Sequence, residues 1–144
     1  MAQYVREVMS SLPVTMSEDE TLADAARIMC EKDIGDVIVV KRGEKSDGKM
    51  CGIVTDRDIV VRGVAQGKDP SDTTLGEICS HQVYTLPAEA PIDQAVSLMR
   101  EKGVRRLPIE EGGKPVGVIS LGDLARERDQ SSVLGQISSR PPNR

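Results

Sequence analysis

Two segments of the sequence combine a hydroxyl residue with an aspartate at a spacing that could bind a ligand: Gly52–Asp58 and Gly117–Asp123. Each contains glycine, two apolar residues, Thr or Ser, two variable positions and then Asp. Where a strand runs into a helix, free backbone N–H groups and the positive end of the helix dipole attract an anion. The hydroxyl can hold a phosphate there, and the carboxylate one turn further on can accept both hydroxyls of a ribose. Ile53 or Val118 can flank a base.

The same spacing has a structural interpretation. Thr55 with Asp58, and Ser120 with Asp123, each match a capping box, in which two side chains bond to backbone N–H groups of the first helical turn. Such a cap is worth about 1 kcal/mol of stability. Spacing alone does not decide between capping and ligand binding, and one pair of residues can serve both roles.

Residues suited to catalysis or metal binding are scarce. The three cysteines, Cys30, Cys51 and Cys79, share no CxxC spacing, and His81 is the only histidine. This pattern argues against a zinc site and favours ordinary buried or half-buried thiols. Catalysis would require a nucleophile beside a base, or paired carboxylates in one cleft. Because His81 lies in a linker-like stretch, we predict no catalytic residues, no metal site and no enzymatic activity.

An internal repeat carries the two motifs. Leu22–Met29 aligns with Ile92–Met99, and Val5–Met9 aligns with Leu75–Cys79, both at an offset of 70 residues. At the motifs the offset is 65, and the five missing residues fall in a polar, glycine-bearing connection between two strand-like runs. A hairpin tip tolerates such a length change. The chain is therefore predicted to contain the same structural unit twice.

Each repeat is predicted to contain a short helix, a short strand, a long helix, a hairpin and a closing helix. Apolar residues recur at i, i+3, i+4 and i+7 in the long helices, and the β-branched runs 36–40 and 106–109 are typical of buried strands. The predicted organisation is a first repeat at 1–66, a linker at 67–74, a second repeat at 75–128 and a largely flexible C-terminal tail at 129–144.

Composition narrows the classes of function. A net charge of −4 argues against a nucleic-acid surface, which needs clustered Lys and Arg. With no Phe or Trp and two Tyr, stacking platforms for single strands are missing. No apolar run approaches the roughly 20 residues that span a bilayer, and the first residues lack the apolar stretch of a secretory signal. We therefore expect no nucleic-acid or membrane partner and a cytoplasmic location.

The repeated pattern, G-h-x-T/S-x-x-D, is similar to the ribose-and-phosphate motif of cystathionine-β-synthase (CBS) domains, over about residues 5–125. The runs Thr55–Val60 and Gly103–Ile109 also look like CBS sequence, and the two-repeat chain most resembles small bacterial signalling proteins of the hypoxic-response type. The resemblance implies an α/β (α+β) fold: a tandem CBS-domain pair of two β-α-β-β-α repeats, packed through their sheets with pseudo-two-fold symmetry. It also implies a homodimer formed through the helices.

Carried over position by position, the resemblance implies that the motif aspartates bind ribose and that the motif hydroxyls lie beside ribose and phosphate. The apolar motif residues would line the base, and a threonine ahead of each long helix would touch base or phosphate. Arg106 matches a basic residue that reaches phosphate, a role that suits the planar donor fork of arginine. The implied nucleotide-binding residues are Thr15, Ile53, Thr55, Arg57, Asp58, Thr85, Arg105, Arg106, Val118, Ser120 and Asp123.

The two repeats differ in charge beside the motifs. The second has Arg105 and Arg106 where the first has Gly35 and Asp36. A carboxylate near a phosphate weakens the binding of that phosphate, although Arg57 and the nearby Arg62 could compensate. We predict that the two clefts between the repeats are unlike and that the second handles phosphate better. A solvated surface pair is the alternative for the two arginines.

The function predicted from the sequence is a regulatory binding module that senses an adenine nucleotide or adenosyl ligand: AMP, ADP, ATP, NAD or S-adenosylmethionine. No catalytic cofactor is expected. The output would be a conformational change of the dimer that an effector protein reads, and a ligand drives such a change only by binding the two shapes with different affinity. The alternative is a structural or interaction protein that keeps the fold and no longer binds nucleotide.

Overall fold

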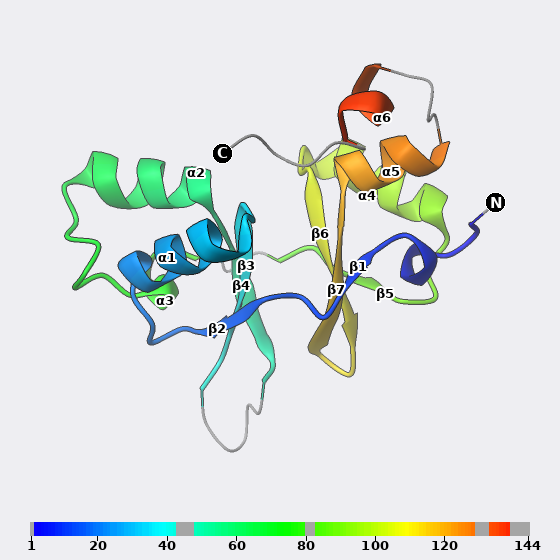
Figure 1. The fold of residues 1–144 in the computed structure, drawn as a ribbon. Coiled ribbons are helices and arrows are strands. Elements are labelled where there is room, and N and C mark those ends of the chain that lie inside the picture. The colour runs from blue at the N-terminus through cyan, green and yellow to red at the C-terminus, as the bar shows by residue number, and fades with distance from the viewer. Residues whose placement is uncertain (1, 43–47, 80–82, 129–132, 139–144) are drawn as a thin grey trace. The chain divides into compact units, whose positions relative to one another are not determined.

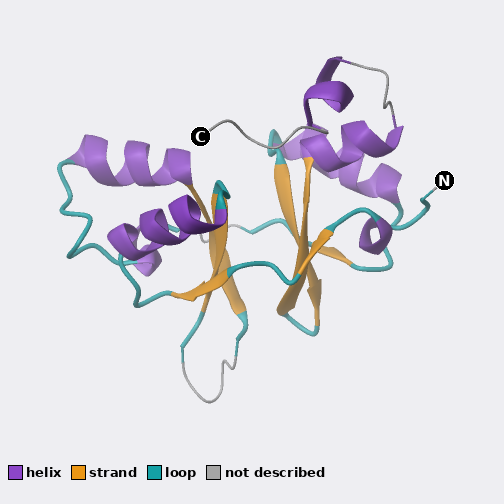
Figure 2. Ribbon diagram, viewed as in Figure 1, coloured by secondary structure: helices purple, strands orange, loops and turns teal. Residues whose placement is uncertain are grey.

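The structure, a computed structural model, describes residues 2–42, 48–79, 83–128 and 133–138. The chain forms two compact units (Figure 1). One, here called the first-repeat unit, is Val14–Val83, and the other, the second-repeat unit, combines Met1–Pro13 with Tyr84–Arg144. Each unit contains one sheet with helices against it, which is the mixed α/β architecture that the sequence predicts (Figure 2).

The first-repeat unit has a three-stranded sheet in the order β2-β3-β4, with β2 parallel and β4 antiparallel to the central β3. Apolar residues of one sheet face pack against α1, α3 and η2 and form its core. Its elements are β2 (Thr15–Ser17), α1 (Leu22–Lys32), β3 (Asp36–Val40), β4 (Met50–Thr55), α2 (Asp56–Asp58), the π-helix η2 (Ile59–Gly63), the 3₁₀-helix η3 (Val64–Gln66) and α3 (Leu75–Ile78).

The second-repeat unit has a four-stranded sheet in the order β1-β7-β6-β5. Its core joins one sheet face to α4, α5 and the N-terminal η1. Its elements are the 3₁₀-helix η1 (Val5–Glu7), β1 (Ser10–Ser11), β5 (Leu86–Pro87), α4 (Ile92–Lys102), β6 (Arg106–Glu111), β7 (Lys114–Ser120), α5 (Leu121–Arg128) and α6 (Val133–Ser138).

The two sequence repeats exchange their leading segments. The N–H of Val5 donates to the carbonyl of Ala90 at 2.9 Å, and the N–H of Leu75, 70 positions later, donates to the carbonyl of Glu20 at 2.8 Å. The first residues of each sequence repeat therefore pack on the other repeat. For this reason the compact units divide the chain at 13/14 and 83/84, whereas the sequence repeats divide it at the linker.

The closing helices of the two repeats differ. In the first-repeat unit the helix after the motif passes from α2 into the π-helical η2 and then into η3. In the second-repeat unit α5 is a regular α-helix, and α6 lies beside it (Figure 1). The sequence predicts a largely flexible tail, but residues 133–138 form α6, whereas the rest of the tail and the hairpin tip at 43–47 lie outside the described residues.

Within the described residues, no helix combines the length and apolar character needed to cross a membrane.

Candidate functional site

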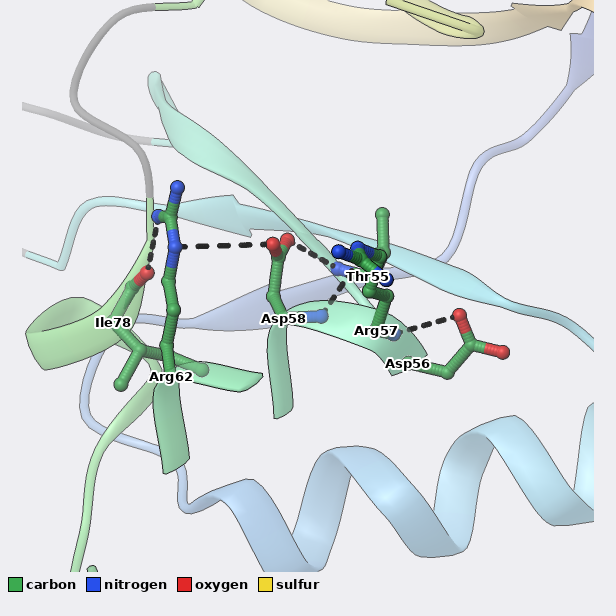
Figure 3. A network of polar contacts seen from close by, with 6 residues as sticks. All are labelled: Thr55, Asp56, Arg57, Asp58, Arg62 and Ile78. Atoms are coloured by element: carbon green, nitrogen blue, oxygen red, sulfur yellow. Dashed lines mark hydrogen bonds and ion pairs between the residues drawn. The ribbon is translucent and has the colours of Figure 1, made fainter. Parts of the chain in front are cut away.

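The first motif lies where β4 runs directly into α2 (Figure 3). The N–H of Asp58 donates to Oγ1 of Thr55 at 3.1 Å, and the N–H of Thr55 donates to Oδ2 of Asp58 at 2.9 Å. These reciprocal bonds form a complete capping box, and the backbone of Thr55 is extended as a helix N-cap requires. The motif therefore holds a hydroxyl and a carboxylate rigidly at the start of a helix.

The second motif repeats this geometry where β7 runs into α5. The N–H of Asp123 donates to Oγ of Ser120 at 3.1 Å, and the N–H of Ser120 donates to Oδ2 of Asp123 at 2.9 Å. The capping interpretation is thus confirmed in both repeats. Ligand binding by the same two pairs stays a prediction, and each carboxylate keeps its Oδ1 outside the capping box.

The surroundings of the two Oδ1 atoms differ. Oδ1 of Asp58 lies 3.9 Å from Nε of Arg62, and the Asp58 side chain is 27% exposed. Arg62 also donates from Nη1 to the carbonyl of Ile78 at 3.1 Å (Figure 3). Oδ1 of Asp123 accepts a hydrogen bond from Nη2 of Arg126, and the Asp123 side chain is only 8% exposed. A ligand can therefore reach the first carboxylate more easily than the second.

Other predicted residues of the first repeat share one face of its sheet. Thr15 pairs in register with Ile38, and Ile38 pairs with Ile53 on the next strand. Because side chains alternate along a strand, Ile53 and Thr55 lie on the face opposite the one that carries the buried Val54. Asp36 is the register partner of Thr55 and so joins this row. The structure thus brings the predicted threonines and Ile53 together on the sheet face away from the helical core.

The second-repeat unit shows the equivalent row with a different charge. Arg106 is the register partner of Ser120, which is the position that Asp36 occupies beside Thr55. Val118 lies two residues before Ser120, on the same face, and is half-buried. Thr85, also half-buried, directly precedes β5. The charge difference predicted from sequence therefore falls beside the motif hydroxyl in each repeat.

Two of the predicted arginines lie elsewhere. Arg57 is exposed, and with Asp56, Val60 and Val61 it lines a shallow hollow of about 300 Å³. Arg105 lines a larger hollow, of about 750 Å³, whose other lining residues come from α4, α5 and the turn before β6. The structure does not group Arg57 or Arg105 with the polar residues of the sheet face, although Arg105 directly precedes Arg106 of that face and Arg57 directly precedes the motif residue Asp58.

The cysteines contain a feature that the sequence pattern did not reveal. Sγ of Cys51 and Sγ of Cys79 lie 3.3 Å apart in the core of the first-repeat unit, whereas Cys30 is exposed. Burial, reinforced by the hydrogen bond to Cys51, raises the pKa of the Cys79 thiol to about 12. The described residues contain no group of three or more His, Cys, Asp and Glu side chains that could hold a metal ion. His81 lies outside the described residues.

The family comparison agrees with the repeat analysis. The family model of the CBS domain matches residues 5–63 and 75–129, so the chain belongs to the CBS-domain family as a tandem pair. Hypoxic response protein 1 of Mycobacterium tuberculosis is 34% identical over 129 residues, which is 90% of this chain and 87% of that protein.

Solved structures show the same fold. The crystal structure of Hypoxic Response Protein I with two coordinated zinc ions has 36% sequence identity and a TM-score of 0.76, over 85% of this chain and 97% of that one. The CBS domain pair of protein MJ0100, in complex with 5′-methylthioadenosine and S-adenosylmethionine, has 25% identity and a TM-score of 0.77, over 90% of this chain and 98% of that one.

Proposed function

We propose that this protein is a regulatory module that binds an adenosyl ligand through its two hydroxyl–carboxylate motifs. Candidate ligands are AMP, ADP, ATP, NAD and S-adenosylmethionine, and no reaction is catalysed. The observation that carries the proposal is the geometry of Thr55 with Asp58 and of Ser120 with Asp123. Each pair is fixed by its own capping box while one carboxylate oxygen is left outside it.

The chemistry of these pairs suits a ribose. A carboxylate accepts hydrogen bonds only, and two neighbouring hydroxyls of a ribose can donate to it in a charge-assisted way. The neighbouring side chains on the sheet face of the first repeat, Ile53 among them, are aliphatic or small and polar. They would flank a base by dispersion and apolar contact, since the chain has no Phe or Trp to stack on it. The MJ0100 domain pair, which binds two adenosyl compounds, supports this ligand class.

The two motifs are proposed to prefer different ligands. Arg106 lies opposite Ser120, and Asp36 lies opposite Thr55. A phosphate gains from a guanidinium nearby and loses from a carboxylate. Nucleotides with a phosphate should therefore favour the second motif. Titration that finds two equal phosphate-dependent sites per chain would refute this difference.

The proposed output is a change of shape in a homodimer. Helices of both units expose apolar side chains that a monomer would leave in water. Val60 and Val64 are 57% and 56% exposed in the first-repeat unit, and Leu121 is 41% exposed in the second. An interface on either helical segment would lie next to the motif of the same unit, because Asp58 and Asp123 stand near the N-terminal ends of these segments. Size-exclusion chromatography with light scattering, with and without ligand, measures the assembly and its response.

A thermal-shift panel tests the ligand class. A ligand that binds only the folded state adds about 2.7 kcal/mol of apparent stability at a hundredfold excess over its dissociation constant. At least one of the five adenosyl compounds should raise the melting temperature, and GTP should raise it less. A flat panel would favour the alternative, a structural or interaction protein of this family. Incubation of the pure protein with each nucleotide should yield no product.

A further inference from the structure

The C-terminal helix α6 contacts the second motif directly. Nη1 of Arg126 donates to the carbonyl of Ser138, the last residue of α6, at 2.5 Å. The same guanidinium bonds to Oδ1 of Asp123 through Nη2. Arg126 therefore links the carboxylate that is proposed to bind ribose to the end of the tail helix. In the first motif Arg62 makes a comparable bridge to the end of α3 and not to a tail helix, since it lies 3.9 Å from Oδ1 of Asp58 and donates to the carbonyl of Ile78.

Gly122 is the second point of contact. A Cβ atom built on Gly122 would lie 2.9 Å from Oγ and 3.2 Å from Cβ of Ser138, and 3.7 Å from Oγ of Ser120. A larger residue at position 122 would require the Ser138 side chain to shift by a few tenths of an ångström, so glycine permits this close approach. The equivalent residue of the first motif, 65 positions earlier, is Arg57. Only the second motif therefore has a tail helix close to it among the described residues. The end of α6 lies near the hydroxyl of Ser120 as well as the carboxylate of Asp123.

The large apolar side chains of the tail helix whose burial is described are exposed. Leu134 and Ile137 are 43% and 65% exposed, and Gly135 is the buried residue among those of α6 whose burial is described. A helix of six residues is too short to be stable alone in water. The order of α6 therefore depends on its contacts with α5, and loss of the bond from Arg126 to Ser138 can release it.

From these contacts we propose that α6 is an intramolecular competitor of the ligand at the second motif. The closed state is the one in which α6 is packed on α5. In this state Arg126 and Ser138 fill the space beside Asp123, and Arg126 takes up the Oδ1 acceptor that a ribose hydroxyl needs. A ligand at this motif must displace α6, and displacement of α6 is then a ligand-dependent output of the chain. The inference rests on the proposed function, because it concerns the same motif.

A reversible crosslink can hold α6 closed. The Cβ positions of residues 122 and 138 are 3.2 Å apart, a few tenths of an ångström below the 3.5–4.5 Å range of a disulfide. A full-length protein with Gly122→Cys and Ser138→Cys should form this bond when diamide removes two electrons and two protons from the thiols. Cys30→Ser is added because Cys30 is exposed. The two single cysteine variants, oxidised in the same way, control for the native Cys51–Cys79 pair.

Binding of AMP by isothermal titration calorimetry is then compared before and after reduction with dithiothreitol. Asp58→Asn is included so that the second motif is the one measured. The crosslinked protein should bind at least about 30-fold more weakly than the reduced protein, because a ligand's apparent affinity falls with the fraction of its competent state. In a matched protein with Asp123→Asn in place of Asp58→Asn, crosslinking should change the affinity less than about twofold.

The remaining outcomes distinguish failure of the α6 role from failure of the proposed function. Equal affinity of the crosslinked and reduced proteins, or failure of the crosslink to form, would overturn the role of α6 and leave the proposed function standing. If the wild type binds none of AMP, ADP, ATP, NAD and S-adenosylmethionine, the proposed function fails and the competitor role fails with it. In the full chain without the crosslink, Arg126→Ala should increase amide hydrogen exchange in 133–138. Unchanged exchange would contradict the link through Arg126.

Discussion

The two roles of Asp58 can be separated by comparing Asp58→Asn with Asp58→Ala. Oδ2 of Asp58 accepts the N–H of Thr55 at 2.9 Å, and an asparagine amide oxygen can accept the same bond. Asn loses only the weak pairing with the half-exposed Arg62 at 3.9 Å and the interaction with the helix dipole. Each of these is worth about 0.3–1 kcal/mol at an accessible site. Ala loses the cap as well, at a further cost of about 1 kcal/mol.

Ligand binding should respond in a different proportion. A hydrogen bond to a charged group contributes about 1.5–3 kcal/mol, which corresponds to roughly 10- to 150-fold in affinity. Asn is neutral and presents an N–H₂ group beside its acceptor, so Asp58→Asn should lose this amount of affinity at the first motif although it stays more stable than Asp58→Ala. Asp58→Ala should lose similar affinity and be clearly less stable.

Two measurements on the same proteins decide the question. Urea denaturation gives the free energy of unfolding, and calorimetric titration with S-adenosylmethionine and with AMP gives the affinities. Asp123→Asn serves as the matched variant of the second motif. If Asp58→Asn binds as tightly as the wild type, the carboxylate is a helix cap alone. If it loses stability and affinity in the same proportion, the loss of binding reflects unfolding, and the reasoning about ribose is refuted.

Three further predictions concern stability and reactivity. Bonds from the N–H and hydroxyl of Thr74 hold the pKa of the Glu77 carboxyl below its ordinary value. This stabilisation is present above the ordinary glutamate pKa and is lost as the pH falls through the folded-state value, so Glu77→Gln should lower the urea midpoint at pH 7 and have little effect near pH 3. Because burial raises the pKa of Cys79 to about 12, iodoacetamide at pH 8 should label Cys30 rapidly and Cys79 only after unfolding; rapid labelling of Cys79 in the native protein would contradict its burial. Gly103 ends α4 with a φ of 65°, so Gly103→Ala should lower the free energy of unfolding by about 1 kcal/mol in urea denaturation; an unchanged value would show that this turn relaxes.

Much of the fold could be predicted from the sequence, because its signals are local and occur twice. Leu22–Met29 and Ile92–Met99 have the apolar spacing of a core-facing helix and lie within α1 and α4. The boundaries of the compact units could not be predicted in this way. Periodicity places Val5 in the first repeat, but whether Val5 packs on its own repeat or on the other depends on tertiary contacts such as its bond to Ala90.

For the candidate site too, the local geometry of each motif could be predicted from the sequence, but its tertiary contacts could not. The spacing of Thr55 and Asp58 predicts the capping box that the structure contains. The spacing of Asp123 and Arg126, three residues apart on one helix, is compatible with their ion pair, but it gives no indication that α6 joins it. The composition of the tail predicts flexibility. The helix α6 could not be predicted from it, because the contacts that order α6 come from α5 and the motif. Sequence adjacency also grouped Arg105 with Arg106, although Arg105 lines a hollow with residues of the helices.

Calorimetric titration of the wild type against the double variant Asp58→Asn with Asp123→Asn tests the central claim most directly. S-adenosylmethionine and AMP are the probes, and the melting temperature of each protein without ligand is the control for folding. The account predicts saturable binding by the wild type to at least one probe. It also predicts that the double variant, folded and with a melting temperature within a few degrees of the wild type, loses at least about tenfold in affinity, equivalent to some 1.4 kcal/mol. Binding of equal strength by the two proteins would contradict it.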